Sequence, residues 1–293
     1  MMIYINGEIL PENEAKISVL DHGLLYGDGI FEGIRLYGGK IFRLKEHLTR
    51  LEMSARSIMM RIPWSPEEIT EAMCATVRAN RLRDGYIRLI LTRGVGDLGL
   101  DPDKCKNPSL IVIAAKIRIY PPEFYEKGMR IIFSSVQRMP GTALDPQAKT
   151  LNYLNNIQAK IEAKNAGVEE AIMLNSSGYV VECTADNIFI VRQGRVLTPP
   201  AHCGALQGIT RGVVVDLARE LGIPLEFPLV TKHDLYTAEE CFLTGTAAEV
   251  APVVQIDGRS LGNGTVGPIT RRLIKAFRET TRVEGHAVYD DEA

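Results

Sequence analysis

Cysteine is scarce in this sequence, and its few copies are not spaced for a cross-link or a metal. The 293 residues contain five cysteines, an odd number, and none forms a Cys-x-x-Cys pair. They are scattered along the chain: Cys74, Cys105, Cys183, Cys203 and Cys241. This pattern argues against a disulfide framework or a zinc site, and it favours reduced thiols in a cytoplasmic protein.

Long apolar runs and an excess of charge are missing as well. No apolar segment is long enough to span a bilayer. The first residues, Met-Met-Ile-Tyr-Ile-Asn-Gly, lack the basic region and the apolar run of a signal peptide. The net charge of −2 and the pI of about 6.3 give no electrostatic reason to bind nucleic acid or an acidic membrane. We therefore expect neither a nucleic-acid nor a membrane partner.

The composition that is present is that of a soluble globular protein. Hydrophobic residues make up 45% and charged residues 24% of the chain. A chain of 293 residues is long for one core, so two domains are expected. Tyr120-Pro-Pro-Glu123 is the first credible linker. We therefore predict a small domain over residues 1–120, a linker over 121–127 and a larger domain over 128–293.

Local patterns predict a mixed α/β (α+β) chain. Asn6-Gly7 and Gly38-Gly39 each separate two apolar runs, which is typical of hairpins. A capping box at Ser65–Glu68 predicts the start of a helix. Further strands are predicted at residues 86–92, 110–115, 129–133, 171–174, 179–183, 187–191, 195–197 and 241–244. Further helices are predicted at residues 44–58, 157–164, 209–221 and 266–281.

Lys149 is the first candidate for chemistry. It follows a loop that contains Gly141 and Pro146, and it precedes a helix-forming run, so we expect it at a loop-to-helix junction. Tyr153 would then lie one helical turn further on, on the same face. A lysine shielded from water there has a lowered pKa, as an imine-forming lysine requires. The alternative is an ordinary solvated lysine at the start of a helix.

Four other stretches carry weaker signals. The glycine and threonine that open the helix in 206–212 offer N–H groups and a positive dipole end for a phosphate, or form a plain N-cap. Residues 245–247 form a tight turn with N–H groups that suit an anion, or an ordinary turn. Glu182 on its strand needs a partner, or it is an edge residue in water. Arg50 is a candidate anion ligand, or it pairs with Glu46 on the helix surface.

Together these stretches resemble the fold type IV pyridoxal-phosphate enzymes, and within them the branched-chain amino acid aminotransferases. The resemblance runs from about Ile3 to about Arg282. The matching stretches are residues 26–35, 46–51, 86–88, 93–100, 149–153, 182–187, 206–211 and 245–250. One departure is that the segment from Lys149 to Tyr153 is one residue shorter than in some bacterial members. The resemblance implies two domains, with the cofactor between them.

The resemblance implies a role for each cofactor-binding residue. Lys149 would bond covalently to pyridoxal 5′-phosphate and then move the proton between the substrate Cα and the cofactor C4′. Glu182 would keep the pyridine nitrogen protonated, and Tyr153 would hydrogen-bond the ring 3-oxygen. Leu206 would pack on the ring face. The phosphate would be held by these residues: Arg50, Gly208, Ile209, Thr210, Gly245 and Thr246.

The resemblance also implies a pocket that accepts both an apolar side chain and that of glutamate. Its apolar wall would comprise Phe31, Gly33 and Tyr26, with Tyr26 reaching in from a second subunit. The α-carboxylate would meet Tyr86 and the N–H groups of Thr246 and Ala247. The γ-carboxylate of glutamate would meet Arg88, with Arg35 as a second candidate. The alternative for Tyr86 and Arg88 is simple alternation along a strand.

The function that the resemblance implies is transfer of the amino group from L-leucine, L-isoleucine or L-valine to 2-oxoglutarate by a homodimer or a larger assembly of dimers. A D-amino acid aminotransferase of the same fold has an Arg-x-His trap in the loop at residues 95–100, and this loop has neither residue. An aminodeoxychorismate lyase would leave Tyr86 and Arg88 unexplained. An (R)-amine transaminase remains an alternative, as does a pyridoxal-phosphate-binding protein without catalysis.

Overall fold

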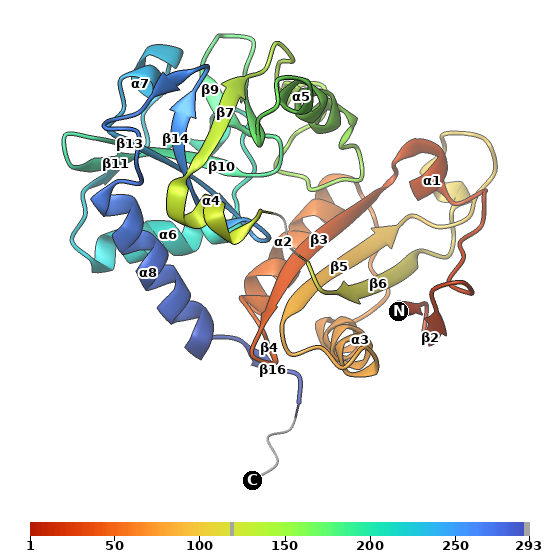
Figure 1. Ribbon diagram of the computed structural model, residues 1–293. Coiled ribbons are helices and arrows are strands. Elements are labelled where there is room, and N and C mark those ends of the chain that lie inside the picture. Colours follow the sequence, from red (N-terminus) through yellow and green to blue (C-terminus); the bar gives the residue numbers. More distant parts are fainter. Residues whose placement is uncertain (118–119, 290–293) are drawn as a thin grey trace. The chain divides into compact units, whose positions relative to one another are not determined.

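The computed structural model describes residues 1–117 and 120–289, and they belong to two compact units (Figure 1). Of the described residues, the first unit comprises 1–117, 148–152 and 281–289. The second unit comprises residues 120–147 and 153–280. Two short segments from later in the chain therefore join the N-terminal part in the first unit. The helices and strands confirm a mixed α/β fold.

The first unit is built on a seven-stranded antiparallel sheet in the order β16-β4-β3-β5-β6-β1-β2. Both predicted hairpins are confirmed, one at Asn6-Gly7 and one at Gly38-Gly39. The strands are β1 (Met2–Ile5), β2 (Glu8–Pro11), β3 (Gly29–Tyr37), β4 (Lys40–Ile41), β5 (Gly85–Thr92), β6 (Ser109–Ala115) and β16 (His286–Ala287).

Two long helices, α2 (Leu44–Ser57) and α3 (Pro66–Ala79), pack on one face of this sheet. The capping box predicted at the start of α3 is present, with Ser65 and Glu68 each bonding the other's backbone N–H. Two short helices complete the unit: α1 (His22–Tyr26) and η1 (Pro102–Lys104).

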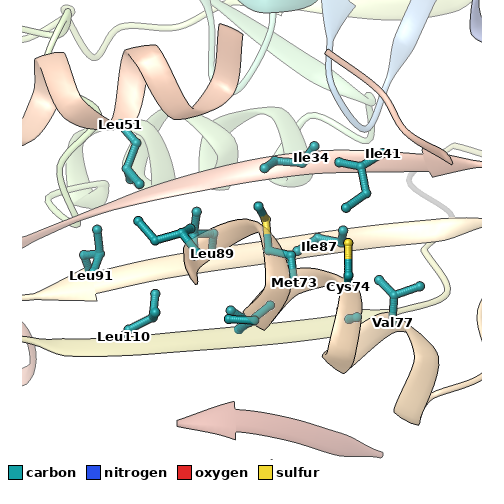
Figure 2. Close-up of a cluster of buried hydrophobic side chains, with 14 of the residues drawn as sticks. Ile34, Ile41, Leu51, Met73, Cys74, Val77, Ile87, Leu89, Leu91 and Leu110 are labelled. Carbon is teal, nitrogen blue, oxygen red and sulfur yellow. The ribbon is translucent and has the colours of Figure 1, made fainter. Parts of the chain in front are cut away.

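The core of the first unit lies between the two helices and alternate residues of the strands. Figure 2 shows Leu51 of α2 and Met73 of α3 directed at the apolar side chains of the sheet. In β3 the residues on this face are Ile30, Glu32, Ile34 and Leu36, so one carboxylate interrupts an apolar row. The opposite face of β3 therefore carries Phe31, Gly33 and Arg35.

Residues 148–152 form a strap along the edge of β3. Phe31 donates its N–H to the carbonyl of Lys149 at 3.0 Å, and Leu151 donates to the carbonyl of Gly29 at 2.9 Å. Ile30 and Thr150 form an antiparallel bridge. These bonds attach the strap to the first unit, although it lies far along the sequence from that unit's other strands.

The second unit is built on a nine-stranded mixed sheet in the order β12-β11-β10-β13-β14-β7-β8-β9, with β15 paired to β14. Its strands are β7 (Met129–Phe133), β8 (Glu170–Leu174), β9 (Val180–Cys183), β10 (Asn187–Arg192), β11 (Arg195–Leu197), β12 (Leu225–Glu226), β13 (Glu240–Gly245), β14 (Glu249–Ile256) and β15 (Arg259–Ser260). Its helices are α4 (Pro122–Lys127), α5 (Leu154–Asn165), α6 (Ile209–Glu220), α7 (Lys232–Tyr236), η2 (Ala201–Cys203) and all but the last three residues of α8 (Pro268–Val283).

Buried aliphatic and aromatic residues from these strands form the second unit's core. Phe189 of β10 and Phe242 of β13 stack with ring centroids 4.9 Å apart. The residues 121–127, expected as a linker, include the helix α4, whose Tyr125 donates to the carbonyl of Ala248 at 3.0 Å. Within the part of the chain that the structure describes, no helix combines the length and apolar character needed to cross a membrane.

Candidate active site

Lys149 is held by its backbone on two sides. Its carbonyl accepts the N–H of Phe31, and its own N–H donates to Oγ of Ser54 in α2 at 3.1 Å. The predicted helical turn from Lys149 to Tyr153 is wrong, because α5 begins only at Leu154 with Tyr153 as its N-cap. Pairing with β3 uses the backbone groups that a helix would need. Lys149 therefore projects from an anchored strap.

The side chain of Lys149 lies over the ring of Phe31. Its Nζ is 4.3 Å from the ring centroid, and the guanidinium carbon of Arg88 is 4.4 Å from the same centroid. Both distances are within the range of cation–π attraction. Phe31 therefore presents an apolar surface that two cationic groups contact.

Tyr86 and Arg88 lie on one face of β5, as the alternation predicts. Arg88 donates from its NH2 to Oη of Tyr86 at 3.1 Å. Gly33 of β3 is the register partner of Arg88, and a Cβ at that position would lie 1.8 Å from Oη of Tyr86. The phenol therefore requires a glycine opposite it. Arg35, the register partner of Tyr86, stacks on Tyr37 with its guanidinium carbon 4.9 Å from the centroid.

Arg50 does not pair with Glu46. Its Nε and NH2 donate to the two carboxylate oxygens of Glu32, both at 2.7 Å, while Glu46 accepts from Arg43 at 3.1 Å. The surface pairing is wrong because the fully buried carboxylate of Glu32 offers a bidentate partner away from water. The same carboxylate is 2.7 Å from Nδ1 of His47.

Tyr26 lies at the end of α1 with 37% of its surface exposed. Its hydroxyl donates to the carbonyl of Leu98 at 2.6 Å, and its ring meets that of His22 edge-on at 5.0 Å. These contacts fix Tyr26 against the loop at residues 95–100.

Glu182 of the second unit is buried, so its interpretation as a solvated edge residue is wrong, although β9 lies at the end of the sheet. Its Oε1 is 3.0 Å from NH2 of Arg138. Its Oε2 accepts from Nδ2 of Asn187 and from the backbone N–H of Leu206, both at 3.1 Å. Every one of these donors favours the ionised carboxylate.

Asn187 connects Glu182 to the segment before α6. Its Nδ2 donates to Glu182 and also to the carbonyl of Leu206, the latter at 2.9 Å. Gly208 is the N-cap and supplies no side-chain cap, so no capping side chain bonds the N–H groups of Ile209 and Thr210 at the positive end of the helix dipole. A Cβ on Gly208 would lie 2.1 Å from Oδ1 of Asn187. This close approach explains the glycine and leaves an N-terminus suited to an anion.

The turn after β13 is shaped by Asp186. A Cβ on Gly245 would lie 1.9 Å from Oδ1 of Asp186, so the glycine lets the turn pass the carboxyl group. Asp186 is buried and accepts from the hydroxyl of Tyr120 at 3.4 Å. Burial, with the carboxylate of Glu170, raises the pKa of Asp186 to about 7. Thr246 and Ala247, which follow Gly245, are half-buried.

A separate cavity of about 1150 Å³ lies in the first unit, lined by residues of α2, by the start of α3 and the segment before it, and by residues 284–286. Its lining combines apolar residues, such as Leu48 and Trp64, with charged ones, such as Arg43 and Glu284. It contains none of the predicted site residues. We therefore assign it no part in the predicted chemistry.

The comparisons with known proteins agree on one family. A family model described as amino-transferase class IV matches residues 29–256. The chain belongs to the class IV aminotransferases. This class IV aminotransferase is 53% identical to a putative branched-chain-amino-acid aminotransferase of Methanocaldococcus jannaschii, over 99% of this chain and 100% of the relative. It is 38% identical to the Pseudomonas aeruginosa branched-chain-amino-acid aminotransferase, over 98% and 95% of the two chains.

Solved structures give the same result. The T.th. branched-chain amino acid aminotransferase, solved with pyridoxamine 5′-phosphate, matches with a TM-score of 0.92 at 42% identity, covering 96% of this chain and 94% of that one. The Escherichia coli branched-chain amino acid aminotransferase matches with a TM-score of 0.93 at 35% identity, covering 99% and 96%. The predicted family and fold type are confirmed. The prediction that the protein is a transaminase dependent on pyridoxal phosphate is confirmed as well.

The residues of the chain fit pyridoxal phosphate. The first unit supplies a lysine held over an aromatic ring. The second unit supplies a buried carboxylate held by three donors and, joined to it through Asn187, a helix N-terminus without a side-chain cap. A lysine, a carboxylate for the protonated pyridine nitrogen and an anion site are the groups that this cofactor needs.

Several of these groups had no signal in the sequence. Arg138 and Asn187 stand in ordinary loop and strand contexts, and they are recognisable only through their contacts with Glu182. Glu32 occupies a core-facing position in a strand that otherwise alternates normally. A carboxylate at a core-facing position was the signal in the sequence that could have identified this cluster, because a buried carboxylate needs buried partners.

Proposed function

We propose that this class IV aminotransferase transfers the amino group of L-leucine, L-isoleucine or L-valine to 2-oxoglutarate, producing the branched 2-oxo acid and L-glutamate. The observation that carries the proposal is the group of Phe31, Arg88 and Tyr86, where an aromatic wall lies beside a guanidinium and a phenol. Such a surface suits an apolar side chain and, alternately, a second carboxylate.

The names of the relatives support this proposal. The relatives from Methanocaldococcus jannaschii, Pseudomonas aeruginosa and Escherichia coli are all named as branched-chain-amino-acid aminotransferases. The T.th. enzyme has been solved with 4-methylvaleric acid and with N-(5′-phosphopyridoxyl)-L-glutamate. These two ligands carry one branched apolar chain and one acidic chain, as the two substrates would.

The proposed chemistry divides among the chain's own residues. The bound cofactor supplies an electron sink for the bond to the substrate Cα. Lys149 holds the cofactor covalently and, once released, moves a proton from the substrate Cα to the cofactor C4′. Glu182 keeps a proton on the pyridine nitrogen, since Arg138 and two N–H donors hold the carboxylate ionised. Tyr153 bonds the 3-oxygen, and Leu206 packs on the ring.

The anion sites complete the proposal. Arg50, Thr246 and the N-terminus of α6, which comprises Gly208, Ile209 and Thr210, bind the phosphate together with Gly245. Tyr86 and the N–H groups of Thr246 and Ala247 bind the α-carboxylate. Arg88 or Arg35 binds the γ-carboxylate of glutamate. Phe31, Gly33 and Tyr26 form the apolar wall.

The test is a substrate panel of L- and D-amino acids with 2-oxoglutarate, followed by the absorbance of the cofactor. We expect conversion of the three branched L-amino acids and no comparable rate for their D-enantiomers. The loop at residues 95–100 supports the L-preference, because it carries no arginine or histidine. Faster conversion of D-alanine than of L-leucine would refute the substrate proposal.

A lysine variant tests the chemistry itself. Lys149→Ala should still bind the cofactor through the phosphate site but lose the covalent bond to it. Turnover should fall by several orders of magnitude, the scale for removal of a catalytic nucleophile or base. Lys164→Ala, at an exposed lysine of α5, is the matched control and should keep the rate. A Lys149→Ala protein with the wild-type absorbance and turnover would show that another residue holds the cofactor.

We further propose a homodimer, and location in the cytoplasm. Exposed apolar side chains gather in the first unit at Val19, Leu24, Leu98 and Leu100, and such groups favour association. Tyr26 lies against this loop and would reach the partner's site. Leu98→Glu should lower the mass measured by light scattering, whereas the control Met59→Glu should not. An unchanged mass for Leu98→Glu would contradict this surface, and cell fractionation would test the location.

A further inference from the structure

Glu32 is a buried carboxylate on the helix-facing side of β3. It has no accessible surface and lies in the row between Ile30 and Ile34. Its oxygens accept three short bonds, from Nε and NH2 of Arg50 and from Nδ1 of His47, each at 2.7 Å. All three residues belong to the first unit. The three side chains therefore form a compact cluster within one unit.

The protonation states within this cluster follow from its charges. Burial alone would raise the pKa of Glu32, but Arg50 and His47 together lower it to about 2. An ionised carboxylate can only accept, so Nδ1 of His47 must carry the proton. Burial lowers the pKa of His47. The carboxylate of Glu32 acts in the opposite direction, and the charges of Arg50 and Lys149 lower this pKa further. His47 is therefore neutral, and Arg50 supplies the only full positive charge among the three residues.

Stability alone does not account for a carboxylate at this position. A buried ion pair gains little over an apolar pair of similar volume, because both charges lose their hydration. An aliphatic residue would continue the row formed by Ile30 and Ile34. What the carboxylate adds is geometry, since two parallel bonds to the Nε–NH2 edge stop the guanidinium of Arg50 from rotating.

We propose that Glu32 is the positioning residue that holds Arg50 in one orientation for the phosphate group of pyridoxal phosphate. This inference rests on the phosphate-binding role proposed above for Arg50. With its Nε–NH2 edge held by Glu32, Arg50 meets the phosphate with the opposite corner of its guanidinium. The side chain is ordered before the ligand arrives, so binding does not have to restrict its rotamers.

Electrostatics and positioning make opposite predictions, which allows a decisive test. The charge of Glu32 opposes the attraction of Arg50 for an anion. Removal of that charge should tighten phosphate binding if charge alone matters, and should weaken it if orientation matters. Glu32→Asp keeps the charge but draws the carboxylate back by one methylene, so only the orientation is lost.

The experiment measures equilibrium binding of pyridoxal phosphate and of pyridoxal, which lacks the phosphate, to the cofactor-free full chain by absorbance. We expect Glu32→Gln and Glu32→Asp each to weaken the binding of pyridoxal phosphate by about tenfold, a change of about 1.4 kcal/mol in binding free energy. Binding of pyridoxal should change by less than about twofold. Glu71→Gln, which removes an exposed partner of Arg78, is the matched control and should change neither.

The outcomes separate the two proposals. If Arg50→Ala leaves the preference for the phosphorylated ligand intact, the phosphate role of Arg50 fails, and the role of Glu32 fails with it. If Arg50→Ala abolishes that preference while both Glu32 variants keep it, only the positioning role is overturned. Equal weakening of both ligands would also overturn it, as would tighter binding of pyridoxal phosphate. Should Glu32→Gln not fold, Glu32→Asp alone decides, because it keeps the buried charge pair.

Discussion

Replacement of Arg88 by alanine should separate the two substrates of the proposed reaction. In the structure, Arg88 rests on the hydroxyl of Tyr86 at 3.1 Å and on the ring of Phe31 at 4.4 Å, with no carboxylate against it among the described residues. An apolar substrate would leave those contacts in place. Glutamate or 2-oxoglutarate would add a charge-assisted pair with the guanidinium.

The expected magnitudes follow from these contacts. Loss of a partly buried charged pair should cost about 2–5 kcal/mol of transition-state stabilisation for the acidic substrate. Its kcat/KM should therefore fall by roughly 30-fold to a few thousandfold. The bond to Tyr86 and the cation–π contact are lost for both substrates. For leucine, where only they and some packing change, we expect less than about 1.5 kcal/mol.

The assay measures the two half-reactions separately by pre-steady-state absorbance of the cofactor. Arg88→Gln is an informative second variant, because its amide can still donate to Tyr86 but carries no charge. This variant should therefore lose activity with the acidic substrate and keep activity with leucine. Arg61→Ala, at an exposed arginine of the same unit, is the control. Equal losses for both substrates would mean that Arg88 binds the shared α-carboxylate or is purely structural, and a selective loss for leucine would refute the pocket.

Three further predictions follow from close contacts. Glu182→Gln should keep the cofactor but slow proton removal from the substrate, and an unchanged single-turnover rate with L-leucine would contradict that role. Gly33→Ala should fold, yet raise KM for both substrates by about tenfold or more because its Cβ displaces the phenol of Tyr86; an unchanged KM would contradict this. Asp186, whose pKa is raised from 3.8 to about 7, holds a proton that the unfolded chain releases, so stability falls as the pH rises from about 4 to 7. Asp186→Asn should remove that loss, at most about 4 kcal/mol, and equal melting curves at pH 4 and pH 8 in the wild type would refute it.

Local chemistry predicted much of the fold. The hairpin at Asn6-Gly7 and the capping box at Ser65–Glu68 depend on neighbouring residues only, and both are present. The path of the strap at residues 148–152 could not be predicted in this way. Its backbone pairs with β3, more than a hundred residues earlier in the chain, and no local pattern reports such a pairing.

The candidate site shows the same division. The alternation of Tyr86 and Arg88 placed both residues on one face, because a strand fixes that relation locally. The partner of Arg50 could not be predicted, since helical spacing offered Glu46 and the fold offered the buried Glu32 from a different strand. Arg50 pairs with Glu32 because burial strengthens a bidentate pair. The sequence alone does not show that Glu32 is buried beside Arg50.

The strand β16 has a consequence for how the protein is made. Val288 beside it is buried in the core of the first unit and donates to the carbonyl of Gly39, while Tyr289 bonds the carbonyl of Leu82. A ribosome that adds about 5–20 residues per second reaches Val288 roughly 10 to 30 seconds after Ile117. The N-terminal half must therefore wait, with one edge of its sheet and part of its core open, until the last strand emerges. Nascent chains stalled before residue 281 should be bound by chaperones that recognise exposed apolar surface.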